Sequence, residues 1–213
     1  MAASNSQSLP VPRIIISSCD AYSDVWHPCI STWLLFWPDC PWKISLLSED
    51  MDIPQQNLIS SIRVGTGKTW STMIRDALLR IEEDNVLLLL DDFILKRRVD
   101  NTLISLLYTQ FINDDLQMLR LVPRPGPRSP RLNKPYGIIR SDEEYRVSTQ
   151  AAFWKKSVLL DLLESHESPW MFELNGTRRS HRYKKFASTY NYALPYYHHD
   201  IQGGKWFPWS VLY

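Results

Sequence analysis

The sequence predicts an α/β fold: an open mixed sheet with helices on both faces, in a single domain. Three observations support this prediction. Residues 13–17, 42–48 and 86–90 are short runs that are almost continuously apolar, as buried strands are. Stretches with a helical spacing of apolar residues lie between these runs. Strands that alternate with helices in this way form an open α/β sheet.

The first half of the chain contains most of these elements. After strand 13–17, a helix is expected from Asp24, its expected N-cap, with Pro28 early in the helix. Pro38 and Pro41 end this helix because proline cannot continue it. Further strands are expected at 42–48, 61–64, 86–90 and 118–122, and further helices at 71–83 and 100–113.

The second half is less regular. Residues 123–131 are rich in proline and arginine and can be neither a helix nor an inner strand. Residues 137–140 and 145–149 are expected to form a hairpin, which makes the sheet mixed. A helix near 156–163 and the stretch 168–174 follow, before an aromatic, irregular end.

The composition fits one globular domain with little net charge. The chain has 213 residues, with 24 Lys and Arg against 23 Asp and Glu, so we expect no nucleic-acid partner. Residues 1–12 are expected to be a flexible tail, and 13–213 the domain. The three cysteines form no close pair, which indicates free thiols in a reducing cytoplasm. We see no signal peptide and no apolar run of about 20 residues, so a cytoplasmic protein is expected.

The stretch Gly65-Thr-Gly-Lys-Thr69 matches the end of a phosphate-binding P-loop. The complete motif needs a glycine at position 62, where this chain has Ile62 in an expected strand. A P-loop kinase that depends on Lys68 is therefore a minor alternative. A glycine-rich turn is the ordinary interpretation, although Lys68 at a helix N-terminus could still contact a phosphate or a ribose.

Asp91 and Asp92 follow the most apolar run of the chain. Two adjacent carboxylates at the end of a buried strand repel each other and resist desolvation. A divalent cation shared with a diphosphate relieves this conflict, because Mg²⁺ and Mn²⁺ accept carboxylate and phosphate oxygens together. A surface turn or a helix cap is the alternative interpretation.

The run "VLLLLDDF" at 86–93 resembles the DxD region of GT-A glycosyltransferases, which use nucleotide-sugar donors. The segments "RIIISSCDAYSDVW", "KISLLSED" and "TWSTMIRDALLRIEEDNVLLLLDDFIL" follow the order of this family. The segments "YRVSTQAAFWKKSVLLDLL" and "SPWMFEL" resemble the acceptor side of GT-A-like proteins from bacterial polysaccharide gene clusters. The resemblance covers about residues 13–206. It departs from the full motif at Phe93, where a second acid would stand.

The resemblance implies a nucleotide-sugar-binding half, 13–122, and an acceptor-side half, 123–213. The donor residues that it implies are Ser17, Ser18, Cys19 and Asp20 near the base and ribose, and Asp91 near the ribose. Asp92 would bind Mg²⁺ or Mn²⁺, and His199 would be a further metal ligand or else an ordinary surface residue. Lys68 is a further donor-side candidate because of its place in the glycine turn.

On the acceptor side, the resemblance makes Glu173 the general base of an inverting enzyme. Trp170 would then form the floor of the sugar site. The alternative is that Glu173 is a surface acid and Trp170 a core anchor. Arg178 and Arg179 belong to a basic stretch that would suit a diphosphate or a lipid-linked acceptor, although such stretches are more often solvated.

These features together predict a glycosyltransferase of polysaccharide biosynthesis. It would move a sugar from a nucleoside diphosphate sugar to a hydroxyl of a glycan or lipid-linked acceptor. A lipid-linked acceptor would bring this cytoplasmic protein into peripheral contact with the inner membrane face. A nucleotidyltransferase that acts on sugar phosphates would use the same carboxylates. An inactive carbohydrate-binding module of the same fold would use only the tryptophans.

Overall fold

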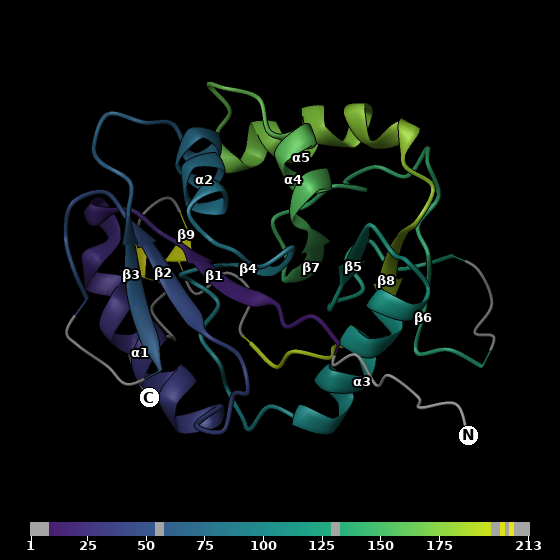
Figure 1. The fold of residues 1–213 in the computed structure, drawn as a ribbon, viewed down its shortest axis with the longest axis horizontal. Coiled ribbons are helices and arrows are strands. Elements are labelled where there is room, and N and C mark those ends of the chain that lie inside the picture. The colour runs from purple at the N-terminus through teal and green to yellow at the C-terminus, as the bar shows by residue number, and fades with distance from the viewer. Residues whose placement is uncertain (1–8, 54–57, 129–132, 197–200, 203–204, 207–213) are drawn as a thin grey trace, which may run out of the picture.

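The computed structural model describes residues 9–53, 58–128, 133–196, 201–202 and 205–206, and a single mixed sheet runs through it (Figure 1). Eight strands form this sheet in the order β3-β2-β1-β4-β7-β5-β8-β6. They are β1 (Arg13–Ser17), β2 (Ile44–Ser48), β3 (Ile59–Arg63), β4 (Asn85–Leu90), β5 (Met118–Arg120), β6 (Tyr136–Ile138), β7 (Ala152–Lys155) and β8 (Phe186–Thr189). A separate antiparallel pair joins β9 (Ile201–Gln202) to β10 (Lys205–Trp206).

Helices cover both faces of the sheet. They are α1 (Ser23–Phe36), α2 (Trp70–Leu79), α3 (Asn101–Asn113), α4 (Lys156–Leu162) and α5 (Pro169–Arg179), with the short 3₁₀ helices η1 (Asp20–Tyr22) and η2 (Ser180–Arg182). Figure 1 shows α2, α4 and α5 on one side of the sheet and α1 and α3 on the other. None of the helices in the described part of the chain is long and apolar enough to cross a membrane.

The central strands bury both of their faces. In β1, Ile14 and Ile16 join the core under α1 and α3, whereas Ile15 joins the core under α2, α4 and α5. In β4, Leu87 and Leu88 divide between the two cores in the same way. Because neither face meets water, these strands are apolar at every position, which is why their runs are continuous in the sequence.

The order of the parallel strands creates a binding crevice. The chain steps from β1 to β2 to β3, and α2 then carries it back to β4 on the other side of β1. The carboxyl ends of β1 and β4 lie side by side, with Ser17 opposite Leu90. The direction of winding reverses between these two strands, and ligands of open α/β sheets bind at such a switch point.

The expected α/β sheet is confirmed, but its second half differs from the prediction. The expected hairpin of 137–140 and 145–149 is wrong. Residues 145–149 form no strand, and β6 pairs instead with β8, about 50 residues further along the chain. The strands β7 and β8 were not predicted, and β7 lies antiparallel between β4 and β5. These pairings join distant segments, so no turn signal in the sequence marks them.

Some helix ends also differ from the prediction. Asp24 is not the N-cap of α1 but lies in its first turn, and Pro28 lies inside the helix. The helix tolerates this proline because Trp26 and Trp33 are buried, which offsets the lost backbone hydrogen bond. Helix α2 ends at Leu79 rather than near residue 83.

Candidate active site

A cavity of about 620 Å³ opens at the switch point between β1 and β4. Its lining residues are Ser17, Ser18, Cys19, Ala21 and Tyr22 after β1, Glu49 after β2, Lys68, Trp70 and Met73 around the start of α2, Leu90, Asp91 and Asp92 at the end of β4, and Pro169 of α5. The size falls within the range in which small molecules bind. Six of the residues expected on the donor side therefore share one cavity, namely Ser17, Ser18, Cys19, Lys68, Asp91 and Asp92.

A chain of hydrogen bonds holds Asp91 in this cavity. The indole Nε1–H of Trp26 donates to Ser18 Oγ at 2.7 Å, and the Ser18 hydroxyl donates to Asp91 Oδ2. Burial raises the pKa of Asp91 to about 7; the bond from Ser18 opposes this shift, and the charge of Asp92 adds to it. Asp91 therefore sits near its midpoint at neutral pH, which is unusual for an aspartate.

The carboxylate doublet fits a hard divalent cation. Asp91 and Asp92 both line the cavity, and a cation beside them would relieve the burial and repulsion that raise the pKa of Asp91. Within the described ranges, no group of three or more His, Cys, Asp or Glu residues gathers into a ready-made metal site. Water or a bound diphosphate would have to supply further ligands. The expected metal ligand His199 lies outside the described residues.

Phe93 shows why the third position of the motif is not an acid. Its side chain is only 4% exposed and its ring stacks on Tyr196, with centroids 4.2 Å apart and planes 14° from parallel. Position 93 therefore points into packed aromatic side chains, where a carboxylate would lose its solvation. The cavity itself receives carboxylates only from positions 91 and 92 of this strand end.

Asp20 does not line the cavity, although it was expected near the base and ribose. Its carboxylate accepts hydrogen bonds from the backbone N–H groups of Glu49 and Asp50, each at 3.0 Å, and of Met51 at 3.1 Å. In return, Glu49 accepts a bond from the Asp20 N–H at 3.3 Å. Asp20 thus ties together the loops after β1 and β2 that border the cavity.

The glycine-rich loop before α2 does not form a phosphate cradle. The N–H groups of Val64 and Gly65 extend the pairing with β2 by donating to the carbonyls of Ser48 and Glu49, at 3.1 and 2.9 Å. The Lys68 ammonium turns back to the Val64 carbonyl and pairs with Asp76 at 2.5 Å. The Val64 and Gly65 N–H groups and the Lys68 ammonium are therefore engaged within the protein rather than directed at a phosphate.

Trp70 is a cavity residue that the sequence alone did not reveal. Its Nε1–H donates to Ser17 Oγ at 2.8 Å, and its ring packs on Phe172 of α5 with centroids 5.3 Å apart. It thereby connects the first turn of α2 to the end of β1. Tyr22 and Glu49 also line the cavity and were not singled out. Their positions just after strands are the signal that could have found them.

Glu173 lies on α5 and is attached to the same edge of the sheet. Its Oε1 accepts hydrogen bonds from the Thr149 N–H at 2.7 Å and the Thr149 hydroxyl at 2.9 Å. Because β7 is antiparallel to β4, with Ala152 opposite Leu88, the residues before β7 lie near the residues after β4. Thr149 thus brings Glu173 to the edge that carries the doublet, although Glu173 does not line the cavity.

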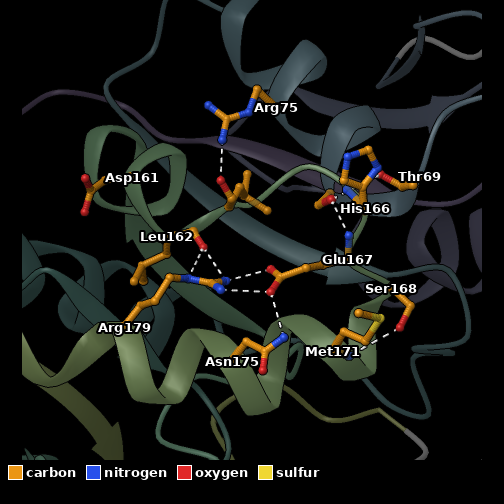
Figure 2. Close-up of polar contacts among 12 residues, drawn as sticks. Thr69, Arg75, Asp161, Leu162, His166, Glu167, Ser168, Met171, Asn175 and Arg179 are labelled. Carbon is orange, nitrogen blue, oxygen red and sulfur yellow. Dashed lines mark hydrogen bonds and ion pairs between the residues drawn. The ribbon is translucent and has the colours of Figure 1, made fainter.

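The other expected acceptor residues have different surroundings. Trp170, in the first turn of α5, is 63% exposed, and Arg178 is also exposed. Arg179 is engaged within the protein: it donates to both oxygens of Glu167 at 2.8 and 2.6 Å and to the Leu162 carbonyl (Figure 2). Trp170 and Arg178 are therefore available to a ligand as they stand, whereas Arg179 is not.

The buried Glu167 joins α5 to the start of α2. Its side chain binds Arg179 and also accepts from Asn175 Nδ2 at 3.0 Å (Figure 2). Its backbone N–H donates to Ser71 Oγ at 3.1 Å, and its carbonyl accepts from the Ser71 N–H at 3.2 Å. This arrangement fixes Trp70 and Pro169, two residues of the cavity wall, relative to each other.

Comparison with known proteins identifies the fold. No family model matches the sequence, and no characterised protein matches it by sequence. Among solved structures, S. aureus TarS 1–349 in complex with UDP matches with a TM-score of 0.58 and 9% identity, over 88% of this chain and 60% of that one. A UDP-glucose pyrophosphorylase complexed with UDP-glucose matches with a TM-score of 0.56 and 8% identity, over 88% and 92%. A cytidylyltransferase from Leptospira borgpetersenii matches with a TM-score of 0.52 and 13% identity, over 86% and 76%.

At such low sequence identities, these matches establish a shared fold but not a shared substrate or reaction. The eight-stranded mixed sheet is the GT-A-like, Rossmann-like architecture expected from the sequence. The chain spans about three-fifths of the TarS fragments, so a substantial part of those structures has no counterpart in it. The neighbours that carry this fold include nucleotide-sugar enzymes.

Proposed function

We propose that the chain is a glycosyltransferase that uses a nucleoside diphosphate sugar. One observation carries the proposal: Asp91 and Asp92 end the central strand β4 inside a cavity of about 620 Å³, at the point where the sheet reverses its winding. The resemblance of the segment 86–93 to the DxD region supports it. So does the fold shared with TarS, which has been solved with UDP and with UDP-GlcNAc.

In this proposal the cavity holds the donor. The nucleoside lies against the loop after β1, where Ser17 and Ser18 offer hydroxyls and Tyr22, 42% exposed, offers a ring for stacking. The diphosphate lies toward Asp91 and Asp92, which would hold Mg²⁺ or Mn²⁺. When bound, the ion supplies positive charge beside the departing diphosphate. Lys68, whose charge Asp76 partly neutralises, adds a weaker contact.

Glu173 is proposed as the general base. It takes the proton of the acceptor hydroxyl while that oxygen bonds to the anomeric carbon of the sugar, and the bond from this carbon to the diphosphate breaks with its electron pair on the diphosphate. Thr149 donates both of its hydrogen bonds to Oε1, and no residue in the described ranges bonds to Oε2, which is therefore the oxygen that receives the proton. Attack from the face opposite the diphosphate inverts the anomeric configuration.

The acceptor would be a glycan or a lipid-linked hydroxyl compound, with the exposed Trp170 as a stacking surface and Arg178 as a cation. A lipid-linked acceptor would bring the protein into peripheral contact with the inner membrane face. The pathway would be polysaccharide biosynthesis.

One alternative has a specific observation in its favour. The chain spans 92% of the UDP-glucose pyrophosphorylase and 76% of the cytidylyltransferase, more than it spans of TarS. A nucleotidyltransferase on this fold would consume a nucleoside triphosphate and a sugar phosphate and release pyrophosphate. The two reactions therefore differ in their products.

Thermal-shift measurements with nucleoside diphosphates and nucleotide sugars, with and without Mn²⁺, test the proposal. We expect stabilisation of the wild type that needs Mn²⁺ and is lost in Asp92→Ala. The matched control is Asp161→Ala, which removes an exposed carboxylate of α4 that pairs with Arg182. Stabilisation by ATP that survives Asp92→Ala but disappears in Lys68→Ala would contradict the proposal. Release of pyrophosphate from a nucleoside triphosphate and a sugar phosphate would favour the alternative.

A further inference from the structure

A second cavity, of about 320 Å³, lies next to the proposed active site. It is lined by Lys96, Arg97, Tyr192, Pro195 and Tyr196. Its position follows from the chain: the segment after the doublet forms one wall, and the segment 192–196 forms the other. The Lys96 N–H donates to the Pro195 carbonyl at 3.0 Å, and Leu95 and Tyr196 form an isolated antiparallel bridge that fixes the two walls together.

Several side-chain contacts form the wall between the two cavities. Phe93 stacks on Tyr196 directly after Asp92, and the Tyr196 hydroxyl donates to Gln150 Oε1 at 3.0 Å and accepts from the Ala151 N–H at 3.3 Å. Tyr196 is only 1% exposed, and burial raises its pKa, so its phenol stays neutral. Because Phe93 directly follows Asp92 and stacks on Tyr196, which lines the second cavity, the doublet and this cavity are neighbours.

The charges around the second cavity are positive. Lys96 and Arg97 are both exposed, and the guanidinium of Arg124 lies over the ring of Tyr192 at 5.7 Å from its centroid. Neither Arg97 nor Arg124 forms an ion pair with any residue that the structure describes, whereas the adjacent Arg98 pairs with Asp39 at 3.0 Å. Arg97 and Arg124 thus carry charges that no ion pair within the described ranges neutralises, and a guanidinium binds phosphate oxygens in pairs.

We propose that this second cavity binds a phosphate group of the acceptor. The proposal rests on the proposed function, since it names the chemical class of the acceptor at the same active site. Lys96 and Arg97 contact the phosphate oxygens, Arg124 adds a third positive charge, and Tyr192 packs against the group next to the phosphate. Because Phe93 and Tyr196 separate the two cavities, a phosphate held there places the rest of the acceptor near the donor sugar.

The test measures binding of glycerol 3-phosphate by isothermal titration calorimetry, in EDTA and without nucleotide. These conditions keep the result separate from the nucleotide-sugar proposal, which depends on Asp92 and Mn²⁺. The variants are Lys96→Gln/Arg97→Gln and, as the matched control, Arg98→Gln, which removes a neighbouring charge that is already paired. We expect the double variant to bind about tenfold more weakly or worse, and the control to bind within about twofold of the wild type. Equal binding by all three proteins, or none by the wild type, overturns the proposal.

Vesicles identify the source of the phosphate. Co-sedimentation with phosphatidylglycerol vesicles is compared with phosphatidylcholine vesicles for the same three proteins. Binding to phosphatidylglycerol that the double variant loses supports the proposal with a lipid as the source. If the double variant loses glycerol 3-phosphate binding but binds vesicles as the wild type does, the result supports the proposal with a water-soluble acceptor as the source of the phosphate. If Arg98→Gln reduces vesicle binding as much as the double variant does, the binding depends on general surface charge. That result counts against the cavity as the phosphate site.

Discussion

Replacing Asp91 by asparagine should stabilise the protein at pH 8 but not at pH 4. Burial is the main reason that the pKa of Asp91 rises from 3.8 to about 7, and the charge of Asp92 contributes. The folded protein therefore keeps a proton that the unfolded chain releases between about pH 4 and pH 7. Wild-type stability must fall as the pH rises through this window, and it is lowest once Asp91 is ionised. Asparagine does not titrate, so the variant escapes this loss.

The size of the effect follows from the shift. A rise of about three pKa units corresponds to about 4 kcal/mol at 1.36 kcal/mol per unit, which is the upper limit of the stabilisation at pH 8. The Ser18 hydroxyl, which donates to Asp91 Oδ2, can donate equally to the side-chain oxygen of asparagine. The substitution therefore removes the charge while it keeps this hydrogen bond.

Urea unfolding in EDTA, at intervals from pH 4 to pH 8, measures the difference between Asp91→Asn and the wild type. Asp161→Asn serves as the control because the carboxylate that it removes is far more exposed than that of Asp91. We expect the difference in unfolding free energy to grow with pH for Asp91→Asn only. Adding Mn²⁺ should stabilise the wild type more at pH 8 than at pH 5, because the ion binds the ionised carboxylate. A difference that stays constant from pH 4 to pH 8 would refute the reasoning.

Three further predictions concern the walls of the cavity. Glu167→Ala should lower the free energy of unfolding by about 3 kcal/mol in urea, because Arg179 stays largely buried and loses its carboxylate partner. Lys68→Ala should weaken UDP binding roughly three- to tenfold in calorimetry, since Asp76 already shares the lysine charge. Trp70→Phe should cost about 1 kcal/mol of stability, because Ser17 loses the indole N–H, and it should also weaken UDP binding.

Each of these predictions has an outcome that would contradict it. A second substitution, Arg179→Met, should recover part of the stability lost in Glu167→Ala; no recovery would show that the ion pair is not the cause. Complete loss of nucleotide binding in Lys68→Ala would contradict the expected minor role of this lysine and support the P-loop interpretation. Unchanged UDP binding in Trp70→Phe would mean that the indole does not shape the donor cavity.

The sequence predicted the parallel half of the sheet well because its signals are local. Strands such as β1 and β4 are buried on both faces, so their apolar runs are visible without knowledge of their neighbours. The hairpin prediction failed because β6 (Tyr136–Ile138) and β8 pair across about 50 residues, and β6 has only three residues. Short strands that are specified by distant partners leave no periodic pattern to read.

The candidate site was predictable where it lies directly after a strand. Ser18 and Asp91 meet because β1 and β4 are adjacent and in register, which their position after apolar runs already indicates. Arg179 could not be assigned in this way. Its surroundings depend on how α5 packs against the segment around Glu167, and a basic stretch looks the same in sequence whether its side chains face solvent or a buried carboxylate.

The glycine-rich loop shows how the fold gives a motif-like sequence a different use. Gly65 and Gly67 have φ angles of +85° and +74°, which explains two glycines without any phosphate, because other residues rarely adopt this conformation. The turn that they make carries the chain from the edge strand β3 into α2, where Thr69 caps the helix by accepting a bond from the Thr72 N–H. Trp70 follows the cap at once and reaches Ser17 at the end of β1. The loop therefore builds a wall of the proposed donor cavity. Under the proposed function, we expect it to contribute to nucleotide binding through the placement of Trp70 more than through the charge of its lysine.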